Sequence, residues 1–222
     1  RIKHDILIPA SDTGGAEHGQ VVTVEIVQQP TRHTQPLGKV VEVLGEIDDP
    51  GMEIEIAVRK FDVPLDFSDA TLKQAAQIPA TVKKTELKGR IDLRDLPFIT
   101  IDGEDARDFD DAVFCLPIEL GTEKRKRPGW RLLVAIADVS HYVKPGEPLD
   151  DDALERGTSV YFPRRVIPML PEALSNGICS LNPDVDRLVL VCDMVIPANG
   201  AKAGTVSAYQ FYDAVIHSHA RT

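Results

Sequence analysis

The first sixty residues carry the hydrophobic pattern of β-strands. A β-branched run covers 21–27, a second apolar run covers 39–44, and apolar and polar residues alternate over 52–58. Val- and Ile-rich runs and strict alternation are both typical of strands. With the short apolar run 6–8, the pattern predicts about four strands, separated by turns rich in Gly and Pro. Because about four strands are few for an independent closed barrel, we expect this module to be incomplete.

Capping residues predict two short helices farther along. Ser68 stands where its side chain can cap a helix over 69–77. Asp150 can cap a second helix that runs to Arg156, and Gly157 is well placed to end it. The first helix falls in the segment between the strand-rich start and Arg90, and the pattern becomes mixed from Arg90 onward.

The chain from Arg90 onward combines strands with the second of these helices. Residues 131–137 form a nearly continuous apolar run, which is typical of a strand buried on both faces. Asn199 and Gly200 separate 191–196 from a β-like stretch over 206–216, and this dipeptide predicts a hairpin turn. We therefore expect an α+β fold for this part.

These patterns divide the chain into three segments. Residues 1–60 form the strand-rich segment, 61–89 form a connector, and 90–222 form the α+β domain. The connector ends in a polar stretch over 83–88 that we expect to be exposed. The sequence contains no internal repeat and no low-complexity tract.

Charge and composition limit the class of protein. The 222 residues include 25 Lys and Arg against 35 Asp and Glu, for a net charge of −10. Overall positive charge therefore cannot carry nucleic-acid binding, although a local basic patch can. With 43% hydrophobic and 27% charged residues, the chain is expected to fold around a packed core. No apolar stretch approaches the roughly 18–20 residues that a membrane span needs, so we expect no membrane partner.

The cysteines indicate a reducing compartment. Cys115, Cys179 and Cys192 are odd in number, lie far apart and form no C-x-x-C pair. We expect free thiols, no disulfide-linked partner and a cytoplasmic location. The chain begins at Arg1 without an initiator Met or a signal-like apolar core, so we expect a fragment or a processed form.

The densest chemistry lies in residues 102–111, the acidic segment, which holds six acids and one Arg for a local charge of −5. Apolar residues flank it on both sides, at 96–100 and 112–115. Like charges about 4 Å apart repel by several kcal/mol at an effective dielectric of about 20, so protonation or a hard cation must relieve them. Oxygen ligands suit Mg²⁺ or Mn²⁺, and two such ions can polarise a phosphodiester and activate water. The segment therefore predicts a divalent-metal site for phosphoryl transfer.

Two other interpretations compete with that site. An exposed acidic loop without a ligand fits the composition alone. A calcium loop of the EF-hand type does not fit, because neither Asp102 nor Asp108 as position one places the required Gly at position six. The pattern by itself does not name a substrate.

Five motifs carry a family resemblance. Residues 92–113 read DLRDLPFITIDGEDARDFDDAV. The others are, in order, VAIADVS at 134–140, GTSVYFP at 157–163, PMLP at 168–171 continuing through LSN and CSLNP to 183, and HSHAR at 217–221. In sequence and order they resemble the catalytic (RNB) domain of the ribonuclease II / ribonuclease R family. The resemblance covers nearly the whole chain.

The resemblance implies a processive 3′→5′ exoribonuclease that hydrolyses single-stranded RNA to nucleoside 5′-monophosphates with Mg²⁺, or with Mn²⁺ in its place. The family's four catalytic aspartates correspond to Asp102, Asp108, Asp110 and Asp111. By this resemblance Asp102 and Asp111 would be metal ligands, and Asp108 and Asp110 would complete the metal site. Tyr161 corresponds to the family tyrosine that stacks near the 3′-terminal nucleotide, and such a stack contributes about 1–3 kcal/mol per base. Arg164 and Arg165 follow this tyrosine and are candidates for contacts with RNA phosphates.

The same resemblance identifies residues 1–60 as the later part of a second cold-shock (OB-like) domain, and hence as a partial β-barrel. Six basic and ten acidic residues argue against RNA binding by this segment alone. The basic run 124–127 predicts an exposed hairpin tip rather than an RNA contact. His217 and His219 are expected to be structural rather than metal ligands.

In the family that this chain resembles, the catalytic domain continues past the position of Thr222. It supplies a catalytic arginine and base-clamping aromatic residues from that later part. We therefore expect the 222 residues alone to be inactive as a nuclease. An alternative from another class is a non-catalytic RNA-binding module in which the acidic segment is structural.

Overall fold

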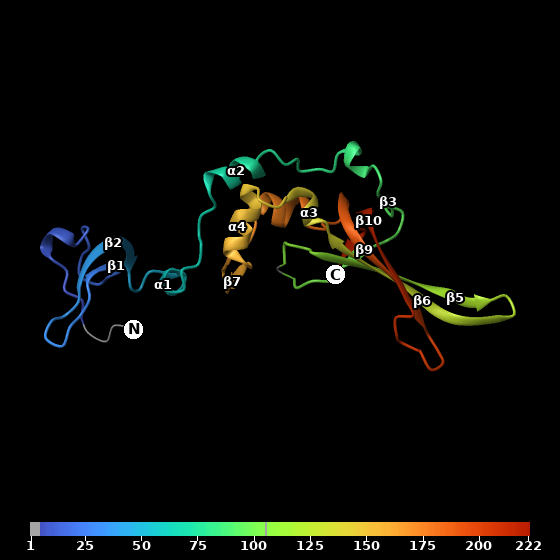
Figure 1. The fold of residues 1–222 in the computed structure, drawn as a ribbon, viewed down its shortest axis with the longest axis horizontal. Helices are drawn as coiled ribbons and strands as arrows, with labels where there is room; N and C mark the ends of the chain where they lie inside the picture. The colour runs from blue at the N-terminus through green and yellow to red at the C-terminus, as the bar shows by residue number, and fades with distance from the viewer. Residues whose placement is uncertain (1–4, 105) are drawn as a thin grey trace. The chain divides into compact units, whose positions relative to one another are not determined.

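The computed structural model describes residues 5–104 and 106–222, so Asp105 of the acidic segment lies outside the described residues. The chain forms two compact units, Arg1–Leu65 and Asp66–Thr222. Figure 1 shows the helices and strands of both units. Within the described part of the chain, no helix is long and apolar enough to cross a membrane.

The first unit contains a two-stranded antiparallel sheet. Its elements are, in order, η1 (Ala10–Asp12), β1 (Gln20–Gln28), β2 (Leu37–Glu46) and α1 (Met52–Lys60). β1 and β2 pair with each other, and they contain the two apolar runs that predicted strands. The predicted strand at 6–8 contributes one isolated bridge, from Leu7 to Leu37. Among the described residues this unit is therefore an open sheet and not a closed barrel.

The strand predicted over 52–58 is wrong, because these residues lie in α1. Alternating apolar residues do not exclude a helix, and here the charges favour one. Arg59 pairs with Glu55 one turn earlier and with Glu42 of β2, the latter at 2.7 Å. Acidic residues in the first turn and basic residues in the last turn also complement the helix dipole.

The second unit is built on a larger sheet (Figure 1). Its strands are β3 (Ile91–Asp92), β4 (Ile99–Thr100), β5 (Asp111–Thr122), β6 (Arg125–Ala137), β9 (Asp186–Pro197), β10 (Ala208–His217) and β11 (Ala220–Arg221). Across the described residues their order is β11-β4-β5-β6-β9-β10-β3. The long central strands are antiparallel, and β3 and β11 run parallel to their neighbours at the edges. A separate hairpin pairs β7 (Val160–Phe162) with β8 (Arg165–Ile167).

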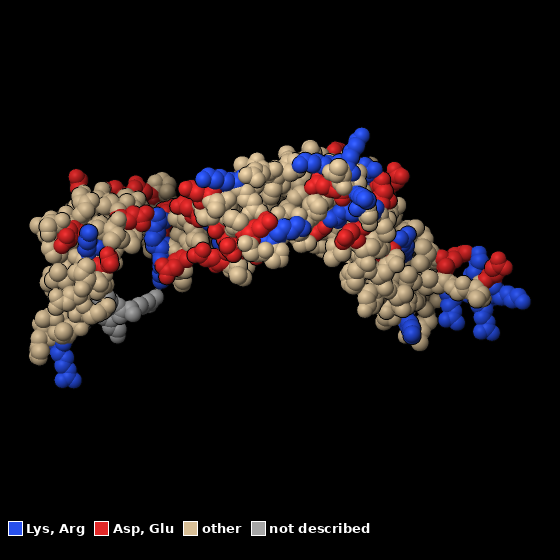
Figure 2. Space-filling view, turned by 45° about the horizontal axis from the view of Figure 1, so that its top comes forward, with Lys and Arg blue, Asp and Glu red and all other residues tan. Residues whose placement is uncertain are grey.

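Two hairpins of this sheet test predictions from the sequence. Thr122 pairs with Arg125, so the basic run 124–127 lies at the exposed tip of the β5–β6 hairpin, as expected. Figure 2 shows Lys and Arg side chains gathered at this tip. The hairpin predicted around Asn199 and Gly200 is confirmed as β9–β10, although residues 198–207 join its strands rather than a two-residue turn.

Helical segments pack on one face of the sheet. They are α2 (Asp69–Ala75), η2 (Lys84–Leu87), α3 (Val139–Tyr142), α4 (Pro148–Arg156) and the π-helical η3 (Ala173–Ile178). The predicted cap of α2 is confirmed, since Ser68 Oγ accepts the Thr71 N–H at 3.2 Å. α2 also packs against α4, because Thr71 Oγ1 donates to the Pro148 carbonyl at 2.7 Å.

The start of α4 differs from the prediction. The helix begins at Pro148 with Glu147 as its N-cap, so the cap expected at Asp150 is wrong. Proline favours the first helical position, because its missing N–H would have no partner there. Asp150 instead accepts the Gly146 N–H at 2.9 Å. Gly157 ends the helix as predicted, with a φ of 71° that glycine adopts without strain.

The main core lies on one face of the sheet, opposite the face on which the helices pack against Leu188 and Val215. Leu133 and Ala135 of β6 are fully buried in this core, beside Val189 of β9. The prediction that 131–137 is buried on both faces is wrong, because Ile136 is 45% exposed. Side chains of a strand alternate between two faces, and the helices that pack against Leu188 leave Ile136, on that same face, partly uncovered.

The three cysteines are free thiols, as predicted. Cys115 is exposed, Cys192 is half-buried and Cys179 is buried. Burial raises the pKa of the Cys179 thiol to about 12. A thiol with so high a pKa is a poor nucleophile, which fits a role in packing.

Candidate functional site

A pocket of about 750 Å³ opens beside the acidic segment. Its wall combines the loop before β5, the β7–β8 hairpin and residues of η3. Among the site residues predicted from the sequence, those that line it are Asp102, Asp108, Asp110, Tyr161, Arg164 and Arg165. The fold thus brings acidic, aromatic and basic groups from distant parts of the sequence to one place.

Asp111 is placed differently from the other three predicted aspartates. It opens β5, pairs with Ile136 of β6 and does not line the pocket. Successive residues of an extended chain point in opposite directions, which separates Asp111 from Asp110. The charge of Asp111 still acts on Asp110, so the two remain electrostatically coupled.

Contacts at both ends hold the acidic segment in place. Arg221 of β11 donates to the carbonyl of Gly103 at 3.2 Å and to that of Glu104. Its guanidinium also lies over the Phe109 ring, 4.8 Å from the centroid. Phe109 itself is 3% exposed and packs in the main core. The segment is therefore anchored to the sheet and is not a freely solvated loop.

The pocket carboxylates repel one another. Partial burial raises the pKa of Asp110, and the charges of Asp108, Asp102 and Asp111 raise it further. Oδ2 of Asp102 is buried and has no hydrogen-bond partner within the described residues. A proton or a cation would relieve both the repulsion and the unpaired oxygen.

The chemistry of this donor set fits a hard divalent cation. Carboxylate oxygens are the ligands that Mg²⁺ and Mn²⁺ prefer, and Asp102 offers an unpaired one. In the described ranges, no three His, Cys, Asp or Glu side chains are already arranged around one ion position. The pocket thus offers the oxygen donors and the excess negative charge that a divalent cation favours, from Asp102, Asp108 and Asp110. Their side chains are not already arranged around one ion position.

Tyr161 connects the β7–β8 hairpin to the acidic segment. Its hydroxyl donates to Asp108 Oδ2 at 2.7 Å. This hydrogen bond, together with burial, raises the pKa of Tyr161. The residue remains 63% exposed, so its ring can stack on a base while the hydroxyl is held. Arg164 and Arg165 stand at the turn of the same hairpin.

The η3 wall of the pocket was not predicted from the sequence. Its polar residues are Glu172, Ser175 and Asn176, which lie in or next to the π-helical turn. Such turns occur often at functional sites. The motif LSN at 174–176 marked this region, but nothing in its spacing indicated a pocket.

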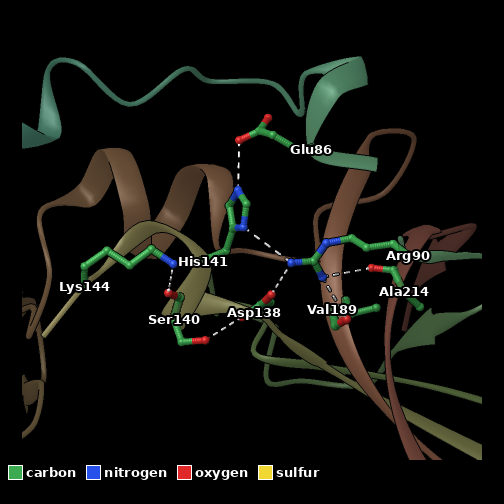
Figure 3. Close-up of polar contacts among 8 residues, drawn as sticks. All are labelled: Glu86, Arg90, Asp138, Ser140, His141, Lys144, Val189 and Ala214. Carbon is green, nitrogen blue, oxygen red and sulfur yellow. Dashed lines mark hydrogen bonds and ion pairs between the residues drawn. The ribbon is translucent and has the colours of Figure 1, made fainter. Parts of the chain in front are cut away.

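A buried ion pair lies directly after β6 (Figure 3). Asp138 and Arg90 lie 2.5 Å apart, and their side chains are 12% and 9% exposed. Burial alone would raise the pKa of Asp138, but hydrogen bonds from Arg90 and Ser140 outweigh it and lower that pKa. His141 lies between Arg90 and Glu86 of η2, at 3.4 Å and 3.0 Å. The network ties the segment before β3 to the end of β6.

Comparison with protein families identifies the second unit. Residues 90–222, which contain every predicted site residue, match the RNB domain. The chain belongs to the RNB family. Residues 1–68 also match a cold shock domain, which agrees with the resemblance of the strand-rich start.

Relatives of this RNB chain are considerably longer. Ribonuclease R of Escherichia coli (strain K12) is 54% identical over 221 residues, which cover 100% of this chain and 26% of that protein. The chain therefore spans about a quarter of the length of this curated relative.

Two solved structures share the fold of this chain. RNase R of Mycoplasma genitalium, in complex with ribose-methylated single-stranded RNA, matches with a TM-score of 0.87 and 29% identity, over 100% of this chain and 33% of that one. Yeast Ssd1, described as a pseudonuclease, matches with a TM-score of 0.69 over 98% of this chain and 27% of that one. Its 16% identity shows a common fold alone.

Proposed function

We propose that this chain supplies the metal-binding carboxylates and the base-stacking tyrosine of a 3′→5′ exoribonuclease site. The proposed reaction is Mg²⁺-dependent hydrolysis of single-stranded RNA to nucleoside 5′-monophosphates, with Mn²⁺ able to replace Mg²⁺. One observation carries the proposal, namely that Asp102, Asp108 and Asp110 line the same pocket as Tyr161. Membership of the RNB family and the likeness to an RNase R bound to single-stranded RNA support it.

The pocket carboxylates would hold the cation. When bound, a divalent ion polarises a phosphodiester and lowers the pKa of an attacking water. Asp102 contributes its unpaired Oδ2, and the raised pKa of Asp110 marks a position that favours added positive charge. Asp108 also accepts a hydrogen bond from the Tyr161 hydroxyl at its Oδ2. This bond would link the carboxylates that hold the cation to the ring that stacks on the base.

The β7–β8 hairpin would orient the RNA. The exposed ring of Tyr161 offers a stacking surface that accepts any base, at about 1–3 kcal/mol per stack. Arg164 and Arg165 add positive charge to the same pocket, where RNA phosphates would pass. Recognition through stacking and phosphate contacts is independent of sequence, as RNA degradation requires. The 3′ polarity of the proposal derives from the family resemblance.

The rival function is RNA binding without catalysis. The two functions differ in whether the pocket carboxylates are needed for turnover or only for shape. Asp110→Asn separates them, because it removes a charge while keeping the shape of the side chain. Asp48→Asn is a matched control, because Asp48 is exposed and belongs to the first unit.

The deciding assay uses 5′-labelled single-stranded RNA with Mg²⁺ or EDTA. This chain is tested beside a polypeptide of the relatives' length, which contains the same 222 residues within a chain as long as ribonuclease R of Escherichia coli. Each is prepared as wild type, Asp110→Asn and Asp48→Asn. We expect a 3′-shortening ladder from the longer wild type and its Asp48→Asn variant with Mg²⁺ only. Asp110→Asn should give no ladder and should bind the RNA within about threefold of wild type. An undiminished ladder from Asp110→Asn, or one that persists in EDTA, would refute the proposal.

A further inference from the structure

Arg187, near the start of β9, is a buried arginine whose hydrogen bonds go to backbone carbonyls. It is 5% exposed. Nε donates to the Ser180 carbonyl at 2.7 Å, Nη2 to the Gly177 carbonyl at 3.0 Å, and Nη1 to that of Asp186 at 2.9 Å. Within the described residues no carboxylate forms an ion pair with it, and burial lowers its pKa. Burying a guanidinium without a paired carboxylate costs folding free energy, because the charge loses its hydration.

One contact of Arg187 leads to the acidic segment. Ser180 is fully buried, and its Oγ accepts the Phe109 N–H at 3.0 Å and donates to the Arg107 carbonyl at 3.1 Å. The Leu181 N–H also donates to the Phe109 carbonyl, at 2.8 Å. These bonds fix the backbone immediately before and after Asp108. Arg187 in turn fixes the backbone of Ser180.

A second contact of Arg187 leads to the opposite wall of the pocket. Gly177 lies in η3, and its φ of −103° and ψ of −111° depart from helical values. Its carbonyl is turned to Arg187, while Ser175 and Asn176 of the same turn line the pocket. The Asn182 side chain adds a bond to the Asn176 carbonyl at 3.1 Å.

We propose that Ser180 and Arg187 are positioning residues of this pocket. Together they form a clamp that holds the carboxylate of Asp108 at a set distance from the η3 wall, against the repulsion among the pocket acids. The proposal rests on the proposed nuclease function for its kinetic consequence, but its structural part does not depend on that function. Neither side chain lines the pocket, so both act through the backbone that they hold.

Ser180→Ala is the sharpest perturbation of the clamp. It removes the hydroxyl that joins Arg107 to Phe109 and leaves the Leu181–Phe109 bond in place. Ser218→Ala is a matched control, because Ser218 is also buried but its Oγ has no hydrogen-bond partner among the described residues. Arg187→Lys is a second variant, which keeps the charge and loses the planar fork that reaches several carbonyls at once.

The first readout is hydrogen exchange at the Phe109 amide in this chain. Exchange should become at least about tenfold faster in Ser180→Ala and unchanged in Ser218→Ala, because only the former frees that N–H. The second readout is steady-state cleavage of RNA by the polypeptide of the relatives' length. In Ser180→Ala and Arg187→Lys, kcat should fall about tenfold to a hundredfold while KM for RNA changes little, as for a displaced catalytic group.

Each result decides the proposal. Faster Phe109 exchange together with a selective loss of kcat supports it. Unchanged exchange overturns it, and so does faster exchange with kcat within about twofold of Ser218→Ala. If the wild type shows no turnover, the nuclease proposal fails by itself. The clamp is then judged by exchange and by Mn²⁺ affinity, which should fall in Ser180→Ala and stay constant in Ser218→Ala.

Discussion

Asp138→Asn would keep the shape of a buried side chain and remove the charge that faces Arg90. The Arg90 side chain is 9% exposed, and its backbone contacts are long, at 3.4 Å to Val189 O and 3.5 Å to Ala214 O. Removing one partner of a buried ion pair costs about 3–5 kcal/mol, because the other charge is left uncompensated. We expect the free energy of unfolding of the second unit to fall by about 3 kcal/mol. For a unit of this size, that lowers Tm by about 6–12 °C.

A double-mutant cycle isolates the pair from other effects of the substitution. Arg90→Met, Asp138→Asn and the double variant are unfolded in urea. We expect a coupling free energy of about 2 kcal/mol. The double variant should then lose less free energy of unfolding than the two single variants lose together. If the effects add to within about 0.5 kcal/mol, the ion pair does not stabilise the unit and the reasoning fails.

The pH dependence of the same variants gives an independent check. The pKa of Asp138 is lower in the folded chain than the value of about 3.9 expected for the unfolded one. Its stabilising effect is therefore fully present above that unfolded value and is lost as pH falls through the folded pKa. Wild type should lose stability over this acid range more steeply than Asp138→Asn. Parallel curves would contradict the direction of the shift.

Three further substitutions test other parts of the structure. Tyr161→Phe should keep RNA affinity within about threefold, whereas Tyr161→Ala should weaken it about 5- to 150-fold in anisotropy titrations; equal losses would exclude stacking. Ser68→Ala removes the cap of α2 and should lower the free energy of unfolding by about 1 kcal/mol, so an unchanged urea midpoint would count against the cap. The pKa of Asp193 is lowered mainly by a hydrogen bond from Arg131. Asp193 therefore stabilises the fold fully above the unfolded pKa of about 3.9, and this stabilisation is lost as pH falls through the lower pKa of the folded chain. In Asp193→Asn, the free energy of unfolding should depend less steeply on pH below about 3.9 than in wild type. An equally steep pH dependence in both proteins would contradict this assignment.

Local signals in the sequence predicted part of the local structure. The cap at Ser68 was predictable because its partner lies three residues away. The error over 52–58 has a local cause too, since alternating apolar residues occur in helices as well as in strands. The pairing of Arg59 with Glu42 of β2 and the burial of Met52 and Val58 add tertiary reasons for the helix. Burial of a single face of β6 depends on which elements cover the sheet, and the composition of one strand does not encode that.

The site was predictable in its residue types but not in its geometry. The acidic segment stands out by charge alone, and the family resemblance supplied Tyr161. The hydrogen bond from Tyr161 to Asp108 joins residues 53 apart, and that from Ser180 to Arg107 joins residues 73 apart. Contacts of this kind arise from sheet order and loop packing, so no local pattern indicates them. The separation of Asp111 from its neighbours likewise depends on where β5 begins.

Titration of Mn²⁺ into the RNA-free chain, followed by electron paramagnetic resonance of the free ion, tests most directly whether the pocket carboxylates hold a divalent cation. The comparison needs wild type, Asp102→Asn and the exposed control Asp48→Asn. We predict that wild type and Asp48→Asn bind Mn²⁺ alike and that Asp102→Asn binds it at least about tenfold more weakly, because the ion loses a carboxylate ligand. Equal affinities in all three, or no binding by folded wild type, would contradict the assignment of this pocket as the metal site.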